Sequence, residues 1–438
     1  MSADKPPAPR MGTDDRGSTS AGAAGRSPLL FIFLTVFIDL LGFGIVIPLL
    51  PVYTKAYGAS ETQLGILFGC FSGMQFVFAP MWGRISDRIG RRPVLIGGLV
   101  GTAASYVLFG LANSMTLLFA SRILAGFFGA NISTAQAYIA DVTTPENRAK
   151  GMGLIGAAFG LGFTLGPWIG GELAGWAPQM PGFVSAALSI TAAAFGYFKL
   201  AEPARERRSS SRIFHADQAR HALQDARIGI VLLLSFVFIF SWSAFESMFT
   251  VFALREFPDI FGVPQAIEHA TFDDIIHAAP IVGRYMGFIG IMSAIIQGGL
   301  IRRLVPRFGE TTLAVAGPAI LALSFVVLCV AQSWAVVIVA CAIMPIGFGI
   351  NNPALQGLVS RASPQAEQGA YMGMNQSMLS LARLTGPVCA GLVFRAFGPR
   401  SPFLMGTAVL VACALLAYTY HVRYAASFPR EARGAVEA

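Results

Sequence analysis

Apolar residues along the chain gather into long runs that short polar stretches separate. Each run is about as long as the roughly 20 residues that an α-helix needs to cross a bilayer. Only two connecting segments are long, 201–227 and 254–279. The pattern predicts an all-α integral membrane protein with twelve transmembrane helices, at about 29–51, 62–82, 93–112, 116–140, 149–174, 181–200, 228–253, 280–301, 312–331, 334–358, 369–394 and 402–421.

The composition agrees with a chain whose solvent is lipid. Hydrophobic residues make up 55% of the sequence and charged residues 12%, whereas soluble domains contain about 25% charged residues. This balance excludes an ordinary cytosolic enzyme, and it also excludes a disordered chain, which would be poor in apolar residues. The sequence carries no Ser/His/Asp arrangement, phosphate-binding loop or metal-ligand cluster. We therefore expect no enzymatic activity, no metal, and no cofactor beyond a proton as coupling ion.

Basic residues are distributed unevenly between the two sides of the predicted bundle. Of the 31 Lys and Arg residues, 24 fall on the side of the termini, five on the other side and two within predicted helices. Because basic residues collect in cytoplasmic loops, both termini are expected in the cytoplasm. The net charge of +8 then indicates orientation and not a nucleic-acid partner. Short loops favour a bacterial inner membrane, and we expect a monomer whose partners are the lipid bilayer and a small-molecule substrate.

The chain contains an internal repeat. Asn131 and Gln136 recur 220 residues later as Asn351 and Gln356. Two membrane halves related by a parallel repeat are a transporter architecture, with the binding site at their interface near the midplane. The sequence therefore predicts two pseudo-symmetric six-helix bundles. The expected domains are a disordered cytoplasmic N-tail (1–28), an N-terminal bundle (29–200), a cytoplasmic linker (201–227), a C-terminal bundle (228–421) and a cytoplasmic C-tail (422–438).

Four charged residues stand well inside predicted helices. They are Asp39, Arg122, Glu246 and Arg383. A charge at the bilayer centre costs at least ~2.5–3.5 kcal/mol, so these side chains should face the bundle interior or a water-filled cavity. One interpretation is a structural pair that fixes helix packing. The other, which we favour for most of the four, is a direct role in function.

The two acids are candidates for proton coupling. Asp39 lies near the middle of the first predicted helix, and Glu246 is the one deeply placed acid of the second half. An acid in such a cavity can take up a proton from one side and release it to the other. Trp242 precedes Glu246 by one helical turn, so both share a face, which fits an aromatic wall beside an acid. The alternative is an interfacial Trp with a water-facing Glu.

The two arginines and several amides are candidates for substrate binding. Arg122 can hold an ionised Asp39 or bind an anionic group of a substrate, and Arg383 can serve as counter-ion to Glu246 or as a packing residue. Amides within spans either line the cavity or form interhelical hydrogen bonds, which are worth about 0.6 kcal/mol each. The amides in question include the repeated residues Asn131, Gln136, Asn351 and Gln356.

Several segments resemble the major facilitator superfamily. Residues 83–93 read GRISDRIGRRP, like the signature loop of that superfamily, and 122–130 read RILAGFFGA, like its fourth-helix motif. Residues 162–171, GFTLGPWIGG, resemble the fifth-helix motif of its proton-coupled antiporters. The stretch 137–150 and the surroundings of Asp39 resemble tetracycline exporters and their relatives. The resemblance covers about residues 29–421 and implies the major facilitator fold.

The resemblance also implies roles for individual residues. A cytoplasmic latch between the halves would consist of Gly83, Asp87, Arg88, Gly90 and Arg91, with Asp141, Glu146 and Arg148 as neighbouring partners. Residues that would bend the fifth helix against its partner in the other half are Gly162, Gly166, Pro167, Gly170 and Gly171. The second-half loop has no acid before Glu310, so its latch is expected to be degenerate.

These observations lead to one functional hypothesis and two rivals. The hypothesis is a secondary active transporter, a proton-coupled antiporter that exports a hydrophobic or amphipathic, drug-like molecule by alternating access. The first rival keeps the fold and changes the cargo to an organic anion or metabolite that moves with protons. The second is a channel or a non-transporting receptor, which would show unsaturable flux or ligand binding without flux.

Overall fold

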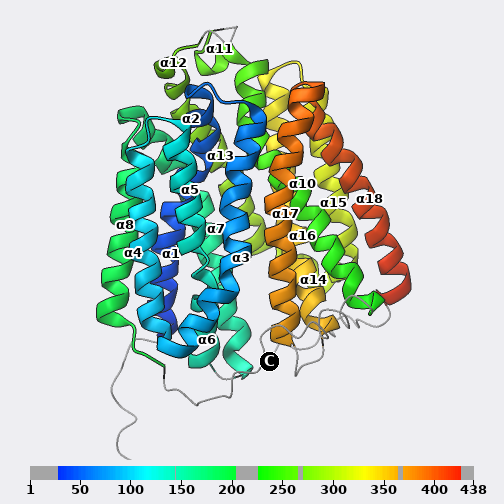
Figure 1. Ribbon diagram of the computed structural model, residues 1–438. Helices are drawn as coiled ribbons and strands as arrows, with labels where there is room; N and C mark the ends of the chain where they lie inside the picture. Colours follow the sequence, from blue (N-terminus) through cyan, green and yellow to red (C-terminus); the bar gives the residue numbers. More distant parts are fainter. Residues whose placement is uncertain (1–27, 144, 204–224, 265–269, 364–367, 426–438) are drawn as a thin grey trace, which may run out of the picture.

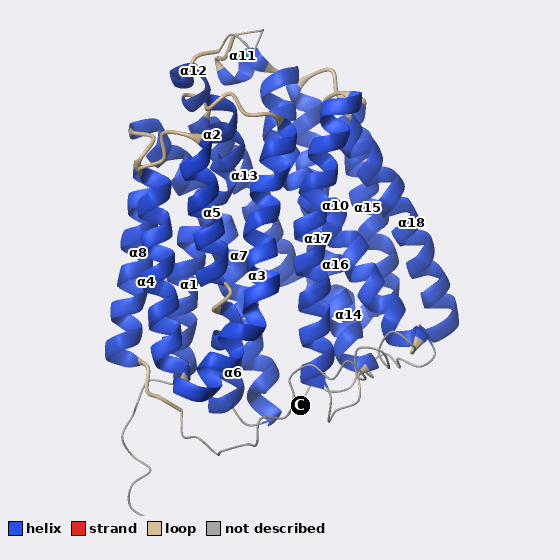
Figure 2. Ribbon diagram, in the orientation of Figure 1, coloured by secondary structure: helices blue, strands red, loops and turns tan. Residues whose placement is uncertain are grey.

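A computed structural model describes residues 28–143, 145–203, 225–264, 270–363 and 368–425. These ranges are helical, with no β-strand among them (Figure 2). The first half contains α1 (Pro28–Val46), η1 (Ile47–Leu49), α2 (Leu50–Ala56), α3 (Glu61–Ile89), α4 (Arg91–Gly110), α5 (Met115–Gly129), α6 (Ile132–Val142), α7 (Pro145–Trp176) and α8 (Met180–Lys199). The second half contains α10 (Ala226–Glu256), α11 (Pro258–Phe261), α12 (Phe272–Ile276), α13 (Ala279–Ile295), η3 (Ile296–Leu300), α14 (Ile301–Phe308), α15 (Glu310–Cys329), α16 (Trp334–Ala362), α17 (Gln368–Phe397) and α18 (Ser401–Tyr424).

The helices account for the predicted membrane segments. Within the described ranges, eleven helical segments are long and apolar enough to cross a membrane, three of them formed by consecutive helices such as α5 and α6. The remaining long helix, α7, has 32 residues and covers the predicted segment 149–174. With α7, each of the twelve segments predicted from the sequence overlaps one helical span, and four of them (93–112, 181–200, 280–301 and 312–331) run one to six residues past its end. The predicted all-α membrane fold is confirmed.

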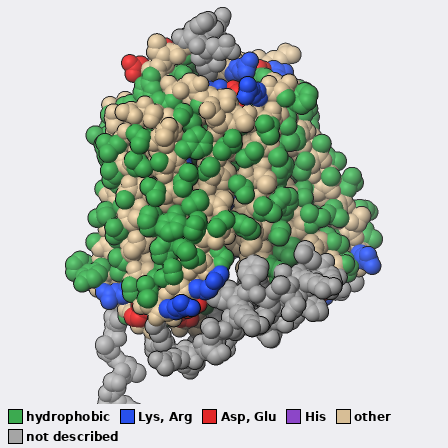
Figure 3. Space-filling view, viewed as in Figure 1, with side chains coloured by type: hydrophobic (Ala, Val, Ile, Leu, Met, Phe, Trp, Pro, Cys, Tyr) green, Lys and Arg blue, Asp and Glu red, His purple; other side chains and the backbone are tan. Residues whose placement is uncertain are grey.

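The helices form two bundles that stand side by side. In Figure 1, α1 to α8 form the left-hand bundle, and α10 and α14 to α18 form the right-hand one. The start of α1 and the end of α18 both lie at the lower end, which we call the terminal face, and the upper end is the opposite face. Hydrophobic side chains cover the surface between these faces, and charged side chains gather at the two ends (Figure 3). This is the surface expected of a protein embedded in lipid.

Backbone packing joins the two bundles near the opposite face. The main contacts between the halves pair α3 with α17 and α7 with α13. A Cβ added to Gly171 would lie 2.7 Å from the Ala279 carbonyl oxygen and 2.8 Å from the Gly283 Cα. Only glycine allows helices to approach this closely. Farther toward the terminal face, a Cβ at Gly83 or Gly160 would meet no atom within 4 Å. The close packing is thus concentrated near the opposite face.

An ion pair on the same face also joins the halves. Arg284 of α13 donates from Nε to Glu172 Oε1 of α7 over 2.8 Å. The two side chains are 63% and 39% exposed, and exposed ion pairs contribute about 0–1 kcal/mol. Tyr57 packs its ring against Phe272 of α12, with centroids 5.4 Å apart. The backbone contacts at the glycines therefore contribute more than this ion pair to holding the two halves together at the opposite face.

Two regions of the structure differ from the prediction. The segment 254–279, expected as a long loop, contains the short helices α11 and α12. The motif at 83–93, expected as a loop, is helical up to Ile89. The helix ends at Gly90, whose φ is 122°. The predicted N-tail, C-tail and linker fall almost entirely outside the described residues.

The glycine packing leads to a prediction about stability. Gly171→Ala should destabilise the protein by about 1–3 kcal/mol, because the added methyl group overpacks the contact with α13. Gly160→Ala, in the same helix but in open space, is the matched control and should be stabilising by about 0.5–1 kcal/mol. Thermal unfolding in detergent measures both. Equal unfolding temperatures for the two variants would contradict the proposed role of Gly171.

Candidate functional site

A central cavity lies between the two bundles. Both halves line it: α1 to α7 and η1 from the first, and α10 and α17 from the second. The space between its lining atoms amounts to about 1240 Å³, a figure that includes open solvent. Much of the wall is apolar and aromatic, including Phe43, Phe68, Phe71, Phe128 and Phe163. The cavity can therefore hold a hydrophobic ligand.

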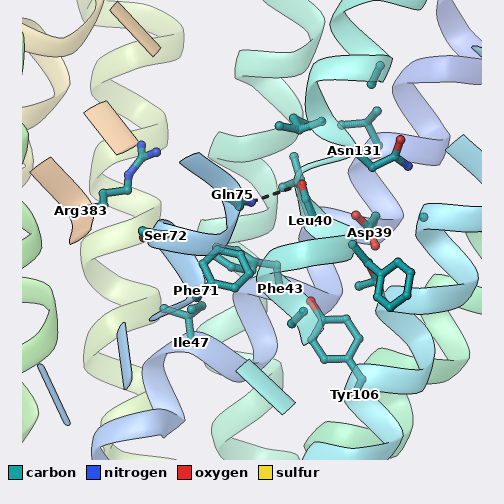
Figure 4. Close-up of a pocket in the computed structure, with 18 of the residues that line it drawn as sticks. Asp39, Leu40, Phe43, Ile47, Phe71, Ser72, Gln75, Tyr106, Asn131 and Arg383 are labelled. Carbon is teal, nitrogen blue, oxygen red and sulfur yellow. Dashed lines mark hydrogen bonds between the residues drawn. The ribbon is translucent and has the colours of Figure 1, made fainter. Parts of the chain in front are cut away.

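Asp39 supplies the acid of the first half. On α1 the lining residues Val36, Asp39, Leu40 and Phe43 recur at the spacing of one helical face. The side chain of Asp39 lies at the cavity wall near Asn131 and Tyr106 (Figure 4). The fully buried hydroxyl of Ser189, on α8, donates to Asp39 Oδ1 over 3.0 Å. This hydrogen bond fixes the orientation of the carboxylate and leaves its other oxygen for further contacts.

Glu246 and Arg383 supply the charges of the second half. Both line the cavity, from α10 and α17, together with Gln376 and Ser243. In Figure 4 the guanidinium of Arg383 lies across the open space from Asp39. Glu246 and Arg383 are close enough to interact electrostatically, although they form no ion pair within 4 Å in the described chain. The cavity thus carries one acid on one wall and an acid with a base on the other.

Arg122 lies behind the cavity wall. Its side chain is fully buried, and its guanidinium carbon lies 5.0 Å from the ring centroid of Phe109 and 5.7 Å from that of Tyr106. Tyr106 lines the cavity, whereas Arg122 does not. The Nε atom donates to Ser121 Oγ over 3.3 Å, and neither terminal nitrogen has a hydrogen-bond partner among the described residues. The structure does not bring Arg122 within ion-pair distance of Asp39.

The repeated amides have different surroundings. Asn131 lines the cavity, and its Nδ2 donates to the Leu95 carbonyl over 2.9 Å. Asn351 is fully buried against Gly317, as Asn131 is against Gly98. Both asparagines thus pack on a glycine of the neighbouring helix, which agrees with a shared architectural role. Gln136 is half-buried away from the cavity, and Gln356 is exposed.

Of the residues predicted to bind substrate, Asn131 and Arg383 line the cavity. Trp242 does not, because it stacks on Phe348 with ring centroids 4.0 Å apart. Sequence reasoning missed other parts of the wall. Gln75 was detectable as a polar residue in an apolar run, and its Nε2 donates to the Gly129 carbonyl over 3.3 Å (Figure 4). Ser189 was not detectable, because serine is common in membrane helices.

A cluster of charges lies at the terminal face of the first half. Arg91 contacts Asp87 over 2.6 Å and Asp141 over 2.9 Å, so one arginine joins the ends of α3, α4 and α6. Arg88 is exposed, and Gly83 lies in open space. The predicted partners Glu146 and Arg148 have side chains outside those that the structure describes. Both ion pairs of Arg91 stay within the first half.

Glu202 caps the start of α4. Its Oε1 accepts from the backbone N–H of Arg91 over 2.7 Å, and its Oε2 accepts from that of Arg92 over 3.0 Å. Negative charge is favourable at the N-terminus of a helix. A Cβ at Gly90 would lie 2.9 Å from the same carboxylate, so glycine leaves the space that Glu202 occupies. Asp87, by contrast, contacts Arg91.

Comparison with known proteins identifies the family. The profile described as Major Facilitator Superfamily matches residues 32–383 and 289–436. The chain belongs to this superfamily. It is therefore a multi-pass membrane transporter and not an enzyme, as the sequence motifs predicted.

Relatives within the superfamily include named resistance proteins. Tetracycline resistance protein, class C, of Escherichia coli is 30% identical over 398 residues, which cover 89% of this chain and 96% of that protein. Multidrug resistance protein 2 of Bacillus subtilis is 31% identical over 394 residues, covering 87% and 92%. The predicted resemblance to drug exporters of the superfamily is confirmed.

Solved structures show the same fold. The crystal structure of the human organic anion transporter MFSD10 (TETRAN) superposes with a TM-score of 0.68 at 25% identity, covering 90% of this chain and 100% of that one. A bacterial homologue of the human lysosomal transporter Spinster, in an inward-facing and occupied conformation, gives a TM-score of 0.72 at 16% identity and covers 92% and 98%.

The glycines of the segment 162–171 face mainly their own half. A Cβ at Gly162 would lie 2.8 Å from the Leu40 carbonyl oxygen, and one at Gly166 would lie 2.6 Å from the Gly44 Cα, both on α1. Gly170 likewise faces Ile45 of α1. The expectation that these residues face the other half therefore holds only for Gly171 and for the Pro167 carbonyl, which approach Gly283 of α13. α7 is the layer between α1 and α13.

The burial of Arg122 leads to a prediction. Arg122→Met should raise the free energy of unfolding by about 1–3 kcal/mol, because an apolar side chain of similar size replaces a buried charge without full hydrogen bonding. Arg383→Met is the matched control, since Arg383 faces the cavity, and it should change stability little. Thermal unfolding of the two variants against the parent protein is the measurement. A lower unfolding temperature for Arg122→Met would show that ring contacts outweigh the desolvation of the charge.

Proposed function

We propose that the protein is a proton-coupled antiporter that exports a hydrophobic or amphipathic small molecule by alternating access. One observation carries the proposal: Asp39 and Glu246 lie on opposite walls of a single cavity between the halves. A carboxyl group in such a cavity is costly when charged, so its protonation changes the energy of whichever conformation encloses it. Two acids at the interface can therefore link proton uptake to the movement of the halves.

The cavity supports a division of roles. Its aromatic side chains, such as Phe43 and Phe71, offer apolar surface to a ligand. Protonation of Asp39 or Glu246 would remove negative charge from the cavity and favour substrate release, and loss of the proton would restore the binding charge. Ser189 holds the Asp39 carboxylate by its hydrogen bond, and Arg383 offsets part of the charge of Glu246. Saturable exchange of proton for substrate follows from such a shared site.

The surroundings of the protein complete the proposal. The terminal face would be cytoplasmic, in agreement with the bias of basic residues toward it, and the membrane would be a bacterial inner membrane. The protein would act as a monomer, with the lipid bilayer and the transported molecule as partners, no nucleic acid, and no cofactor other than the proton. The names of the relatives, tetracycline and multidrug resistance proteins, support export of a drug-like molecule.

The mechanism leads to a prediction about the two acids. The double variant Asp39→Asn, Glu246→Gln should abolish substrate-dependent proton movement, because no titratable acid of the cavity wall remains. Proteoliposomes with an internal pH-sensitive dye and an added substrate cation, tetraphenylphosphonium, measure that movement. The control is Asp259→Asn, Asp273→Asn, which neutralises two exposed acids near the opposite face and should transport normally. Antiport that persists in the cavity double variant would refute the mechanism.

A second candidate function is transport of an organic anion. Arg383 faces the cavity, and the structurally similar MFSD10 is named as an organic anion transporter. With Asp39 and Glu246 ionised, however, the lining carries more negative than positive charge. The primary proposal therefore favours a cationic or neutral ligand.

Two probes of the same shape separate these candidates. Tetraphenylphosphonium and tetraphenylborate differ mainly in the sign of their charge. Purified protein should bind the cation at least about tenfold more tightly than the anion, which corresponds to a difference in binding free energy of ~1.4 kcal/mol. Arg383→Gln should weaken binding of the anion and leave or improve binding of the cation. Isothermal titration gives both affinities. Tighter binding of tetraphenylborate, lost in Arg383→Gln, would instead establish the organic-anion function.

A further inference from the structure

Helix α14 carries three arginines and no acid, near the terminal face of the second half (Figure 1). Arg302, Arg303 and Arg307 are all exposed. Among the residues that the structure describes, none forms an ion pair or a side-chain hydrogen bond with them. The next acid along the chain, Glu310, is paired with Arg361 over 3.2 Å. The guanidinium groups of α14 are therefore available to a partner outside the described chain.

The basic residues at the corresponding turn of the first half are used within the protein. Arg91 forms ion pairs with Asp87 and Asp141. Arg92 donates to the Tyr197 carbonyl, and its guanidinium carbon lies 5.2 Å from the centroid of the Tyr197 ring. The two halves thus differ in what their terminal-face arginines bind, and the difference singles out α14.

The helix before α14 presents an apolar face to lipid. Phe288, Ile291 and Ile295 of α13 are 38%, 49% and 61% exposed. They follow one another at steps of three and four residues, the spacing of a single helix face. No residue of α13 lines the central cavity. This face is therefore the one that α13 turns to the bilayer.

The same face continues into α14 through the π-helical turn η3. A π turn holds more residues than an α turn, so the step across it, from Ile295 to Leu300, is five residues, and Leu300 is again 39% exposed. Further steps of three and four residues lead to Arg303 and Arg307. At ~1.5 Å per residue, Arg303 lies roughly 12 Å beyond Ile295 along the helix. One continuous face therefore changes from apolar side chains to guanidinium groups.

This sequence of surfaces matches a phospholipid with an anionic headgroup. Acyl chains can lie along Ile295 and Leu300, and the phosphate then reaches the level of the arginines. Arg303 and Arg307 are neighbours on the helix surface because they are four residues apart, and guanidinium groups bind phosphate oxygens in a fork. The Arg307 guanidinium carbon also lies 5.5 Å from the ring centroid of Phe308. A zwitterionic lipid brings its own cation to this site, whereas an anionic lipid does not.

We propose that α14 binds the headgroup of an anionic phospholipid, with Arg303 and Arg307 on the phosphate and Arg302 adding to the positive charge around it. The proposal goes beyond a bilayer that merely surrounds the protein, because it assigns one class of lipid to one place on the second half. It needs only that the chain lies in a bilayer, and it is independent of proton coupling and of the transported molecule.

Quenching of a fluorophore by labelled lipids tests the proposal. A bimane label on Leu300→Cys, with the five native cysteines replaced by alanine, reports on the lipids beside this face. Nanodiscs of phosphatidylcholine receive increasing fractions of phosphatidylglycerol or phosphatidylcholine that carry the same doxyl quencher on an acyl chain. Half-maximal quenching should require at least about fivefold less of the anionic lipid, because basic side chains near the bilayer surface attract anionic headgroups. In Arg303→Gln, Arg307→Gln the two lipids should quench within about twofold of each other, because most of that attraction is lost.

Two further variants separate the site from net charge and from packing. Arg84→Gln, Arg423→Gln removes two exposed basic residues elsewhere on the terminal face and should keep the preference for phosphatidylglycerol. Arg303→Lys, Arg307→Lys keeps the charge of α14 and should keep most of the preference. Thermal unfolding in nanodiscs of phosphatidylcholine alone should be the same for all variants, since the substituted side chains are exposed.

Several outcomes would overturn the proposal. Equal quenching by the two lipids in the parent protein would do so, as would a preference that survives in Arg303→Gln, Arg307→Gln or disappears equally in Arg84→Gln, Arg423→Gln. A complete loss in the lysine variant would show that the substitutions act through packing and not through charge. Release of labelled phosphatidylglycerol by millimolar inorganic phosphate would assign the arginines to a soluble phosphate instead. None of these outcomes bears on antiport, which is measured separately.

Discussion

The arrangement of the molecule depends on the contact of bare backbone between its two halves. At Gly171 and Gly283 the helices α7 and α13 approach so closely that no side chain fits between them, and α3 and α17 meet in the same way at Gly65. Lipid provides no hydrophobic driving force between helices, so such contacts rely on close packing. Because they are concentrated near one face, the halves share a firm seam there and enclose the cavity beneath it. The charged residues of the cavity acquire their positions relative to one another from that seam.

The cavity separates two kinds of buried charge. Asp39, Glu246 and Arg383 face the shared space, where water or a ligand can reach them, while Arg122 is sealed behind Tyr106. The first three respond to whatever enters the cavity, whereas Arg122 acts on it through the field it exerts at the wall. A ligand in the cavity can therefore contact the first three charged groups directly, whereas Arg122 acts on it only at a distance.

The sequence predicted the helices well, because apolar length and basic loops are direct consequences of the bilayer. It also singled out four charges within the helices, since a charge in a span is conspicuous. It did not reveal which of them reach the cavity, because that depends on rotation of α5 relative to α4 and hence on packing at Tyr106 and Phe109. Contacts between distant segments were likewise invisible: nothing in the sequence joins Ser189 to Asp39 or Glu202 to the start of α4.

The cap formed by Glu202 has a mechanical consequence. Within a few residues of leaving α8, the chain is fastened to the first turn of α4 through the carboxylate of Glu202. It is also fastened to α6 through the Ala201 carbonyl, which accepts from Tyr138. The last fixed point before the segment that connects the halves is therefore Glu202 and not the end of α8. A pull on the chain beyond Glu202 would therefore act first on the helix turn that carries Arg91, the residue that also forms the ion pairs of this face.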